Sequence, residues 1–167
     1  MKDYSYLKDR YKVTERNVLM LILLPLPFFA LVYLNMTKPV RTIQLPEIPE
    51  IINPLLVSLS LALLMFQQIN FQRNIQGLKE TEVSFENKIM GYLKATSVRY
   101  IILAVVGLIS AFGLLFFSNV GFTIIYAVVM ILVSVLKPSP QRISRIFTLG
   151  QEEKEFVNQI NRYYIDK

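Results

Sequence analysis

The chain has 167 residues and a formal net charge of +6, and 53% of its residues are hydrophobic. Its mean hydropathy of +0.43 is typical of an integral membrane protein rather than a soluble one. It contains no cysteine and no histidine. These absences exclude disulfides, thiolate chemistry and histidine-ligated metal or haem, and they remove the usual general base near neutral pH.

The first expected membrane span covers residues 17–36, which carry no charged side chain. A bilayer core of about 30 Å needs roughly 20 apolar residues in a helix, and this segment has that length. Pro25 and Pro27 lie in its middle, and each removes a backbone donor from the helix. We therefore expect a kink or local unwinding there. A proline-rich loop at 37–53 follows on the far side of the membrane.

The second expected span covers residues 54–71, because Asn53 and Pro54 suit a helix start. Its purely apolar part is short of a bilayer, so the span must include three amides, Gln67, Gln68 and Asn70. Amides buried between helices hydrogen-bond across the interface. We expect these residues to fix helix packing; a polar ligand pocket is the alternative.

The longest uncharged stretch runs from residue 100 to 136, between Arg99 and Lys137. It is too long for one span, and the turn-type sequence at 118–121 divides it into two, 100–117 and 122–136. Gly121 is expected to supply a positive φ in this turn. Small residues recur at helical spacing in the third span and predict close helix packing: Ala104, Gly107 and Ala111.

Three polar segments complete the chain. Residues 1–16 suggest a short basic helix on the membrane surface or a solvated end. The connection at 72–99 contains an amphipathic helix from about residue 82. In the tail, 137–167, helices are expected near 140–147 and 149–164. The second carries an apolar stripe, expected to dock on this chain or on a partner: Phe156, Val157, Ile160, Tyr163 and Tyr164.

The distribution of basic residues predicts the topology. With four spans, 16 of the 18 Lys and Arg residues fall on one side of the membrane. The positive-inside rule places that side, and both termini, in the cytoplasm of a bacterium with the spans in its inner membrane. The positive charge needs no nucleic-acid partner, because anionic lipid explains it. The residues expected to contact such lipid are Arg99, Lys137, Arg142 and Arg145.

The expected fold is thus all-α and integral to the membrane, with four transmembrane helices and cytoplasmic amphipathic helices. The spans hold no ionisable side chain, which argues against ion-coupled transport and against intramembrane catalysis. No cofactor or metal site is indicated. We expect a non-enzymatic accessory or scaffold subunit that contacts membrane lipids and other subunits or copies of itself. The alternatives are a small uncoupled channel lined by the three amides and a lipid-binding, membrane-shaping protein.

Overall fold

The computed structural model describes residues 5–36, 46, 48–79, 83–147, 149–151, 153–155 and 157. The regular structure of these residues is helical, in agreement with the all-α prediction. The helices of this described part are α1 (Ser5–Leu23), α2 (Pro25–Met36), α3 (Ile52–Leu78), α4 (Phe85–Phe117), α5 (Val120–Val135) and α6 (Pro140–Ile146).

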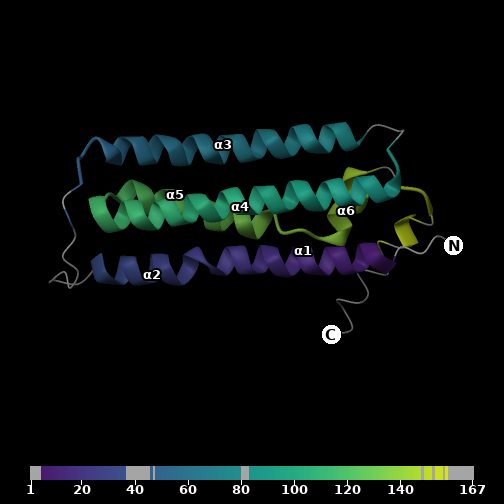
Figure 1. Cartoon of the computed structure of the whole chain (residues 1–167), viewed down its shortest axis with the longest axis horizontal. Coiled ribbons are helices and arrows are strands. Elements are labelled where there is room, and N and C mark those ends of the chain that lie inside the picture. Colours follow the sequence, from purple (N-terminus) through teal and green to yellow (C-terminus); the bar gives the residue numbers. More distant parts are fainter. Residues whose placement is uncertain are drawn as a thin grey trace.

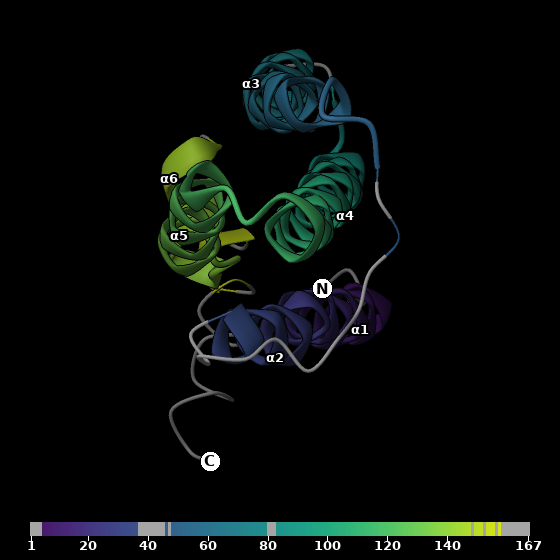
Figure 2. The same ribbon diagram turned by 90° about the vertical axis from the view of Figure 1, so that its left-hand side faces the viewer.

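Helix α4 lies at the centre of an elongated bundle (Figures 1 and 2). Helices α1, α2, α3 and α5 all pack against it. Viewed along the bundle, α3 and the α1–α2 pair lie on opposite sides of α4, and α5 forms a third neighbour (Figure 2). Helix α3 stands at the outside, because α4 is its one extensive partner among the described helices.

The first span differs from its predicted start. A single helix, α1, runs from Ser5 through the expected boundary at residues 16 and 17, so the basic N-terminal segment continues the span. It does not form a separate surface helix, because Leu7 and Tyr11 are buried in the protein. The predicted kink is confirmed: Leu24 forms a turn between α1 and α2, directly before Pro25.

The segment between the second and third expected spans is mostly helical, in agreement with the predicted helical connection. Helix α3 starts at Ile52, two residues before the predicted Pro54, and continues to Leu78. Helix α4 begins at Phe85, where the Ser84 hydroxyl accepts the Asn87 backbone N–H. It then continues into the apolar stretch without a break. At 1.5 Å per residue its 33 residues extend about 50 Å, well beyond a bilayer core of about 30 Å.

The turn between α4 and α5 is tighter than predicted. Ser118 is left-handed, with φ of 54°, and Asn119 caps α5 by accepting the Gly121 N–H at 2.8 Å. The prediction that Gly121 supplies the positive φ is wrong, because Gly121 lies inside α5. A second bond joins this turn to α3, where the Asn119 side chain donates to Asn53 Oδ1 at 3.0 Å.

Three helical segments are long and apolar enough to cross a membrane: Tyr6–Met36, taking α1 and α2 together, α3 and α4. Helix α5 is equally apolar but has only 16 residues. In the most apolar 18-residue stretch of α4, half of the residues are buried inside the protein. In the corresponding stretch of α3, 11% are buried. The chain therefore has the helices of a membrane protein, and α4 is the span most enclosed by its own chain.

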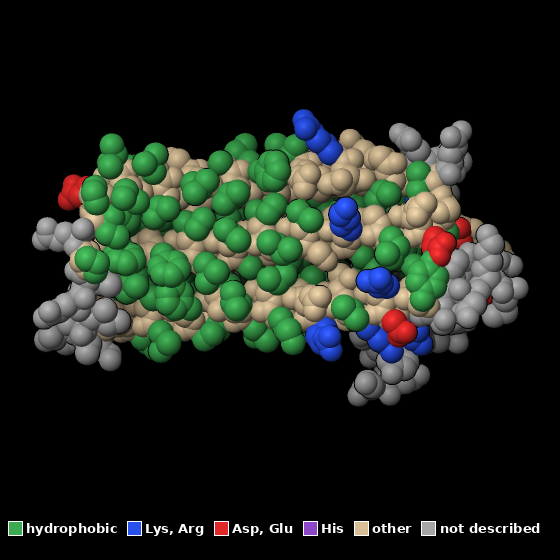
Figure 3. Space-filling model, viewed as in Figure 1, with side chains coloured by type: hydrophobic (Ala, Val, Ile, Leu, Met, Phe, Trp, Pro, Cys, Tyr) green, Lys and Arg blue, Asp and Glu red, His purple; other side chains and the backbone are tan. Residues whose placement is uncertain are grey.

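One end of the bundle forms a core of its own beyond the apolar spans. We call it the basic end; it holds the start of α1, the end of α3, the start of α4, and α6 (Figure 1). Its buried residues come from near both ends of the sequence: Leu7, Tyr11, Ile75, Phe85, Ile89, Tyr92, Leu93, Ile143, Phe147, Leu149 and Val157. In the face shown in Figure 3, Lys and Arg side chains gather towards this end, and hydrophobic side chains cover the remainder.

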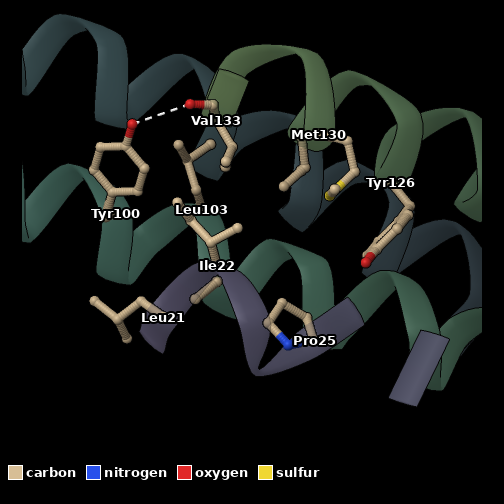
Figure 4. Close-up of a pocket in the computed structure, with 10 residues that line it drawn as sticks. Leu21, Ile22, Pro25, Tyr100, Leu103, Tyr126, Met130 and Val133 are labelled. Atoms are coloured by element: carbon tan, nitrogen blue, oxygen red, sulfur yellow. Dashed lines mark hydrogen bonds between the residues drawn. The ribbon is translucent and has the colours of Figure 1, made fainter. Parts of the chain in front are cut away.

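The interior of the bundle is closely packed near the kink. A small space between α1, α4 and α5 at this level measures about 10 Å³, roughly one water molecule at most (Figure 4). Pro25 lies against Gly107, where an added Cβ would be 3.1 Å from the proline Cβ. Tyr126 stacks on Phe29, with ring centroids 3.7 Å apart. These contacts hold α1, α2, α4 and α5 closely together near the kink.

Candidate functional site

The most unusual group in the described structure is the buried guanidinium of Arg99. Its side chain is only 4% exposed, although arginine is rarely buried without a paired charge. Arg99 Nε donates to Gln67 Oε1 at 2.7 Å, and Nη2 donates to Gln68 Oε1. Both acceptors lie on α3, so this site joins α3 to α4 by side-chain hydrogen bonds.

The acceptors are neutral amides, which has an energetic consequence. Burying a charge is costly unless it is paired, and hydrogen bonds to a charged group recover about 1.5–3 kcal/mol each. No carboxylate contacts Arg99 in the described part of the chain. The two amide oxygens orient the guanidinium and carry part of its solvation, but they leave its positive charge uncompensated.

Aromatic rings extend the site into the basic end. The Arg99 guanidinium carbon lies 4.3 Å from the centroid of the Phe71 ring, in cation–π geometry. Phe71 meets Tyr92 edge-on at 6.3 Å, and Tyr92 meets Phe147 edge-on at 6.5 Å. This row of rings connects the charge to the C-terminal segment.

A second cation lies close to the first. Arg142 on α6 is within electrostatic range of Arg99, and the interaction between them is repulsive. Its Nη1 donates to the carbonyl of Val135 at 3.4 Å, at the negative end of the α5 dipole. The neighbouring Tyr100 hydroxyl donates to the Val133 carbonyl at 3.1 Å (Figure 4). These contacts place Arg99 level with the last turn of α5.

An apolar groove begins beside this charged pair. It runs between α3 and α5, which flank α4 on different sides in Figure 2, and has a volume of about 510 Å³. Gln67 and Gln68 are its polar members. The apolar walls are formed by Leu61, Leu64, Met65, Ile69 and Leu132.

The three predicted span amides separate into two groups. Gln67 is 2% exposed and meets Gln68 at Arg99, consistent with the expectation that buried amides bond a neighbouring helix. Asn70 instead accepts from Asn74 Nδ2 at 3.2 Å, within α3. In the described structure, two of the three amides thus contact Arg99, and the third bonds within its own helix.

The residues predicted to contact lipid also fall into two groups. Lys137, Arg142 and Arg145 surround a polar hollow of about 220 Å³ after α5, together with Ser139 and Gln141. Arg99 differs from its predicted role as a surface lipid contact, because it is buried and bonded to amides. The reason is that α4 continues through residue 99 with the same face turned inwards.

The small residues of the third span lie in the interior. Ala104 and Ala111 are buried, and Gly107 meets Pro25 of α2 and Tyr126 of α5. The described contacts of Gly107 are thus within this chain.

Most of the apolar stripe of the tail lies outside the described residues: Phe156, Ile160, Tyr163 and Tyr164. Val157 is described, is 2% exposed, and belongs to the core of the basic end. Its packing favours docking of the stripe on its own chain at this position.

The burial of Arg99 has a signal in the sequence that we did not use. Tyr92, Thr96, Arg99 and Leu103 recur at helical spacing and are all buried. Continuing the stripe of the amphipathic segment into the span would have placed Arg99 inside.

No known protein family matches this chain, and neither a curated protein nor a solved structure shows significant similarity to it.

Proposed function

We propose that this chain is a non-enzymatic accessory or scaffold subunit of a bacterial inner-membrane complex, with four spans and both termini in the cytoplasm. The observation that carries the proposal is the exposure of α3, a long apolar helix of which one face is packed. Its exposed hydrophobic side chains include Leu55, Leu59 and Phe66, which share one face of the helix. A second membrane protein would find an uninterrupted apolar surface there.

The polar groups of the spans support a role without chemistry. The hydroxyls of Ser60 and Ser110 each donate to a carbonyl one turn earlier in their own helix, at 2.8 Å. Neither is oriented by a neighbouring base in the described structure, as a nucleophile would require. Arg99, the charged group buried deepest, is held by two amides. These groups stabilise helix packing.

The proposed fourth span is α5. Its 16 residues extend about 24 Å, some 6 Å less than a bilayer core. Local thinning of the bilayer accommodates such a difference at a fraction of a kcal/mol per Å. The face of α5 away from the bundle is apolar throughout: Val120, Ile124, Val128, Ile131 and Val135.

The proposed topology can be tested with single cysteines, because the chain has no native cysteine. We expect Lys79→Cys to react with a membrane-impermeant maleimide only after the cells are lysed. Ile51→Cys, beside the start of α3, should react in intact spheroplasts. Both side chains are exposed. The reverse pattern would place the basic end outside the cytoplasm and contradict the topology.

The docking surface can be tested with two matched triple variants. One carries Leu55→Ala, Leu59→Ala and Phe66→Ala on α3; the other carries Val120→Ala, Ile124→Ala and Ile131→Ala on α5. The spacing is the same in both, and all six side chains are exposed. Each truncated interface anchor costs about 1 kcal/mol or more, so the α3 variant should lower recovery of a partner in gentle detergent at least tenfold.

The measurement is quantitative mass spectrometry of proteins that co-purify stoichiometrically with the tagged chain. The α5 variant should retain them at the wild-type level. Equal retention by both variants would show that α3 faces lipid, and the scaffold proposal would lose its support.

A further inference from the structure

The charge at the α3–α4 junction lacks a counter-ion. Arg99 and Arg142 lie within electrostatic range of each other, and the described structure provides neither with a carboxylate partner. Two of the three guanidinium nitrogens of Arg99 donate to amide oxygens, which are neutral. An anion relieves the repulsion between the two guanidinium groups.

The depth of this charge matches the head-group region of a membrane. Arg99 is 18 residues from Phe117, the last residue of α4, which corresponds to about 27 Å along the helix. A bilayer core is about 30 Å thick, so Arg99 lies where the hydrocarbon gives way to phosphate groups. The bond from Tyr100 to Val133 places the end of α5 at this same level.

The size of the adjoining groove restricts what it can hold. The groove measures about 510 Å³, and its lining on α3 extends from Leu61 to Ile69, about 12 Å along the helix. This length is far shorter than a spanning helix and suits a thin, flexible, apolar chain. The walls are apolar, and the two amides of the lining are those that accept from Arg99.

We propose that this groove binds one anionic phospholipid. An acyl chain lies along Leu61, Leu64 and Leu132, and the phosphate is held by the Gln68 amide and the positive field of Arg99 and Arg142. The amide of Gln68 is suited to this role because its side chain is exposed while its Oε1 is already bonded to Arg99. Its NH₂ group is then directed to other acceptors, and a phosphate oxygen is such an acceptor.

The positive charge of Arg99 and Arg142 favours anionic phospholipids over zwitterionic ones. A zwitterionic phospholipid brings its own cation close to the phosphate, which Arg99 and Arg142 would repel. An anionic head group such as that of phosphatidylglycerol carries no such cation. The acyl chain distinguishes a lipid from free phosphate, because only a lipid brings an apolar chain that can pack against the aliphatic side chains of the groove. This inference is separate from the proposed partner surface, which lies on another face of α3.

The experiment uses the delipidated full chain in detergent, titrated with phosphatidylglycerol or phosphatidylcholine of identical acyl chains, and native mass spectrometry counts the bound lipids. We expect one phosphatidylglycerol bound at least tenfold more tightly than phosphatidylcholine. Glycerol phosphate, which has the charge but no acyl chains, should not compete. Equal affinity for the two lipids, or effective competition by glycerol phosphate, would overturn the proposal.

Two pairs of variants locate the site. Leu61→Trp fills the groove, and Val128→Trp places the same ring on the face of α5 away from the bundle; the two side chains are 49% and 40% exposed. Gln68→Leu removes the head-group donor, and Gln72→Leu is its control one turn along the exposed side of α3.

Leu61→Trp and Gln68→Leu should each weaken phosphatidylglycerol binding at least tenfold, and both controls should bind as wild type. Because the targeted side chains are exposed, folding should persist, as thermal unfolding will verify. Equal binding by the members of either pair would reject this site.

Discussion

Replacing Gly113 by alanine is expected to lower the free energy of unfolding by about 1–3 kcal/mol, the usual result of overpacking a core. A Cβ at this position would lie 2.6 Å from Cδ1 of Phe122 and closer still to other atoms of that ring. Phe122 is fully buried and surrounded by other core side chains, so the ring cannot move aside without displacing its neighbours. The loss should appear in equilibrium unfolding by SDS in mixed micelles.

Gly77→Ala is the matched control, since Gly77 also lies in a helix but an added Cβ would meet no atom within 4 Å. Alanine is a better helix former than glycine, so this variant should be more stable by up to about 1 kcal/mol. If Gly113→Ala were as stable as wild type, the close contact between α4 and the start of α5 would be wrong.

Removing Gln67, the acceptor of the buried Arg99 charge, should lower the free energy of unfolding about as much as Gly113→Ala does. Gln67→Leu leaves Arg99 Nε buried without its partner, and an unsatisfied buried donor on a charged group costs about 2–4 kcal/mol. Gln68→Leu removes the other acceptor, but its side chain is exposed and water or a head group can take its place. We therefore expect the second variant to cost under about 1 kcal/mol.

A double variant separates this mechanism from simple loss of packing. Combining Gln67→Leu with Arg99→Leu removes the donor as well as its acceptor, and such paired apolar replacements are often nearly neutral. The double variant should thus be more stable than Gln67→Leu alone. Additive losses, or equal losses for Gln67→Leu and Gln68→Leu, would contradict the role given to Arg99.

Local composition was enough to predict much of the fold. Uncharged stretches located the apolar segments, Pro25 located the break in the first one, and Ser118 and Asn119 lie in the predicted turn. These features depend on backbone chemistry and on the cost of placing charges in lipid. Both effects are local, because they depend on residues that are close together in the sequence. The assignment of α5 as a fourth span, and the topology, remain predictions.

Boundaries between polar and apolar segments were less predictable. The sequence changes character near residues 16 and 99, but α1 and α4 continue through both positions. Helix formation is cooperative, so a change of environment along the chain need not end a helix. The same continuity explains Arg99. The charge of Arg99 suggested a position on the protein surface. Only its helical spacing from buried residues before and after it indicates that the side chain lies in the interior.

The choice of Gln67 and Gln68 as partners of Arg99 depends on how α3 and α4 align. This alignment is a tertiary property, set by contacts between residues more than 30 positions apart. The sequence indicated that the amides needed partners, and the structure identifies the partner.

The composition of the core at the basic end has a consequence for synthesis. Leu7 and Tyr11 lie near the start of the chain, and they share that core with Val157. The ribosome produces these residues far apart in time, so this core is complete only after residue 157 has been made. Chains shortened before residue 157 would lack a buried member of the core, and the end of the bundle that joins the start of α1 to α4 and α6 should be less stable in them.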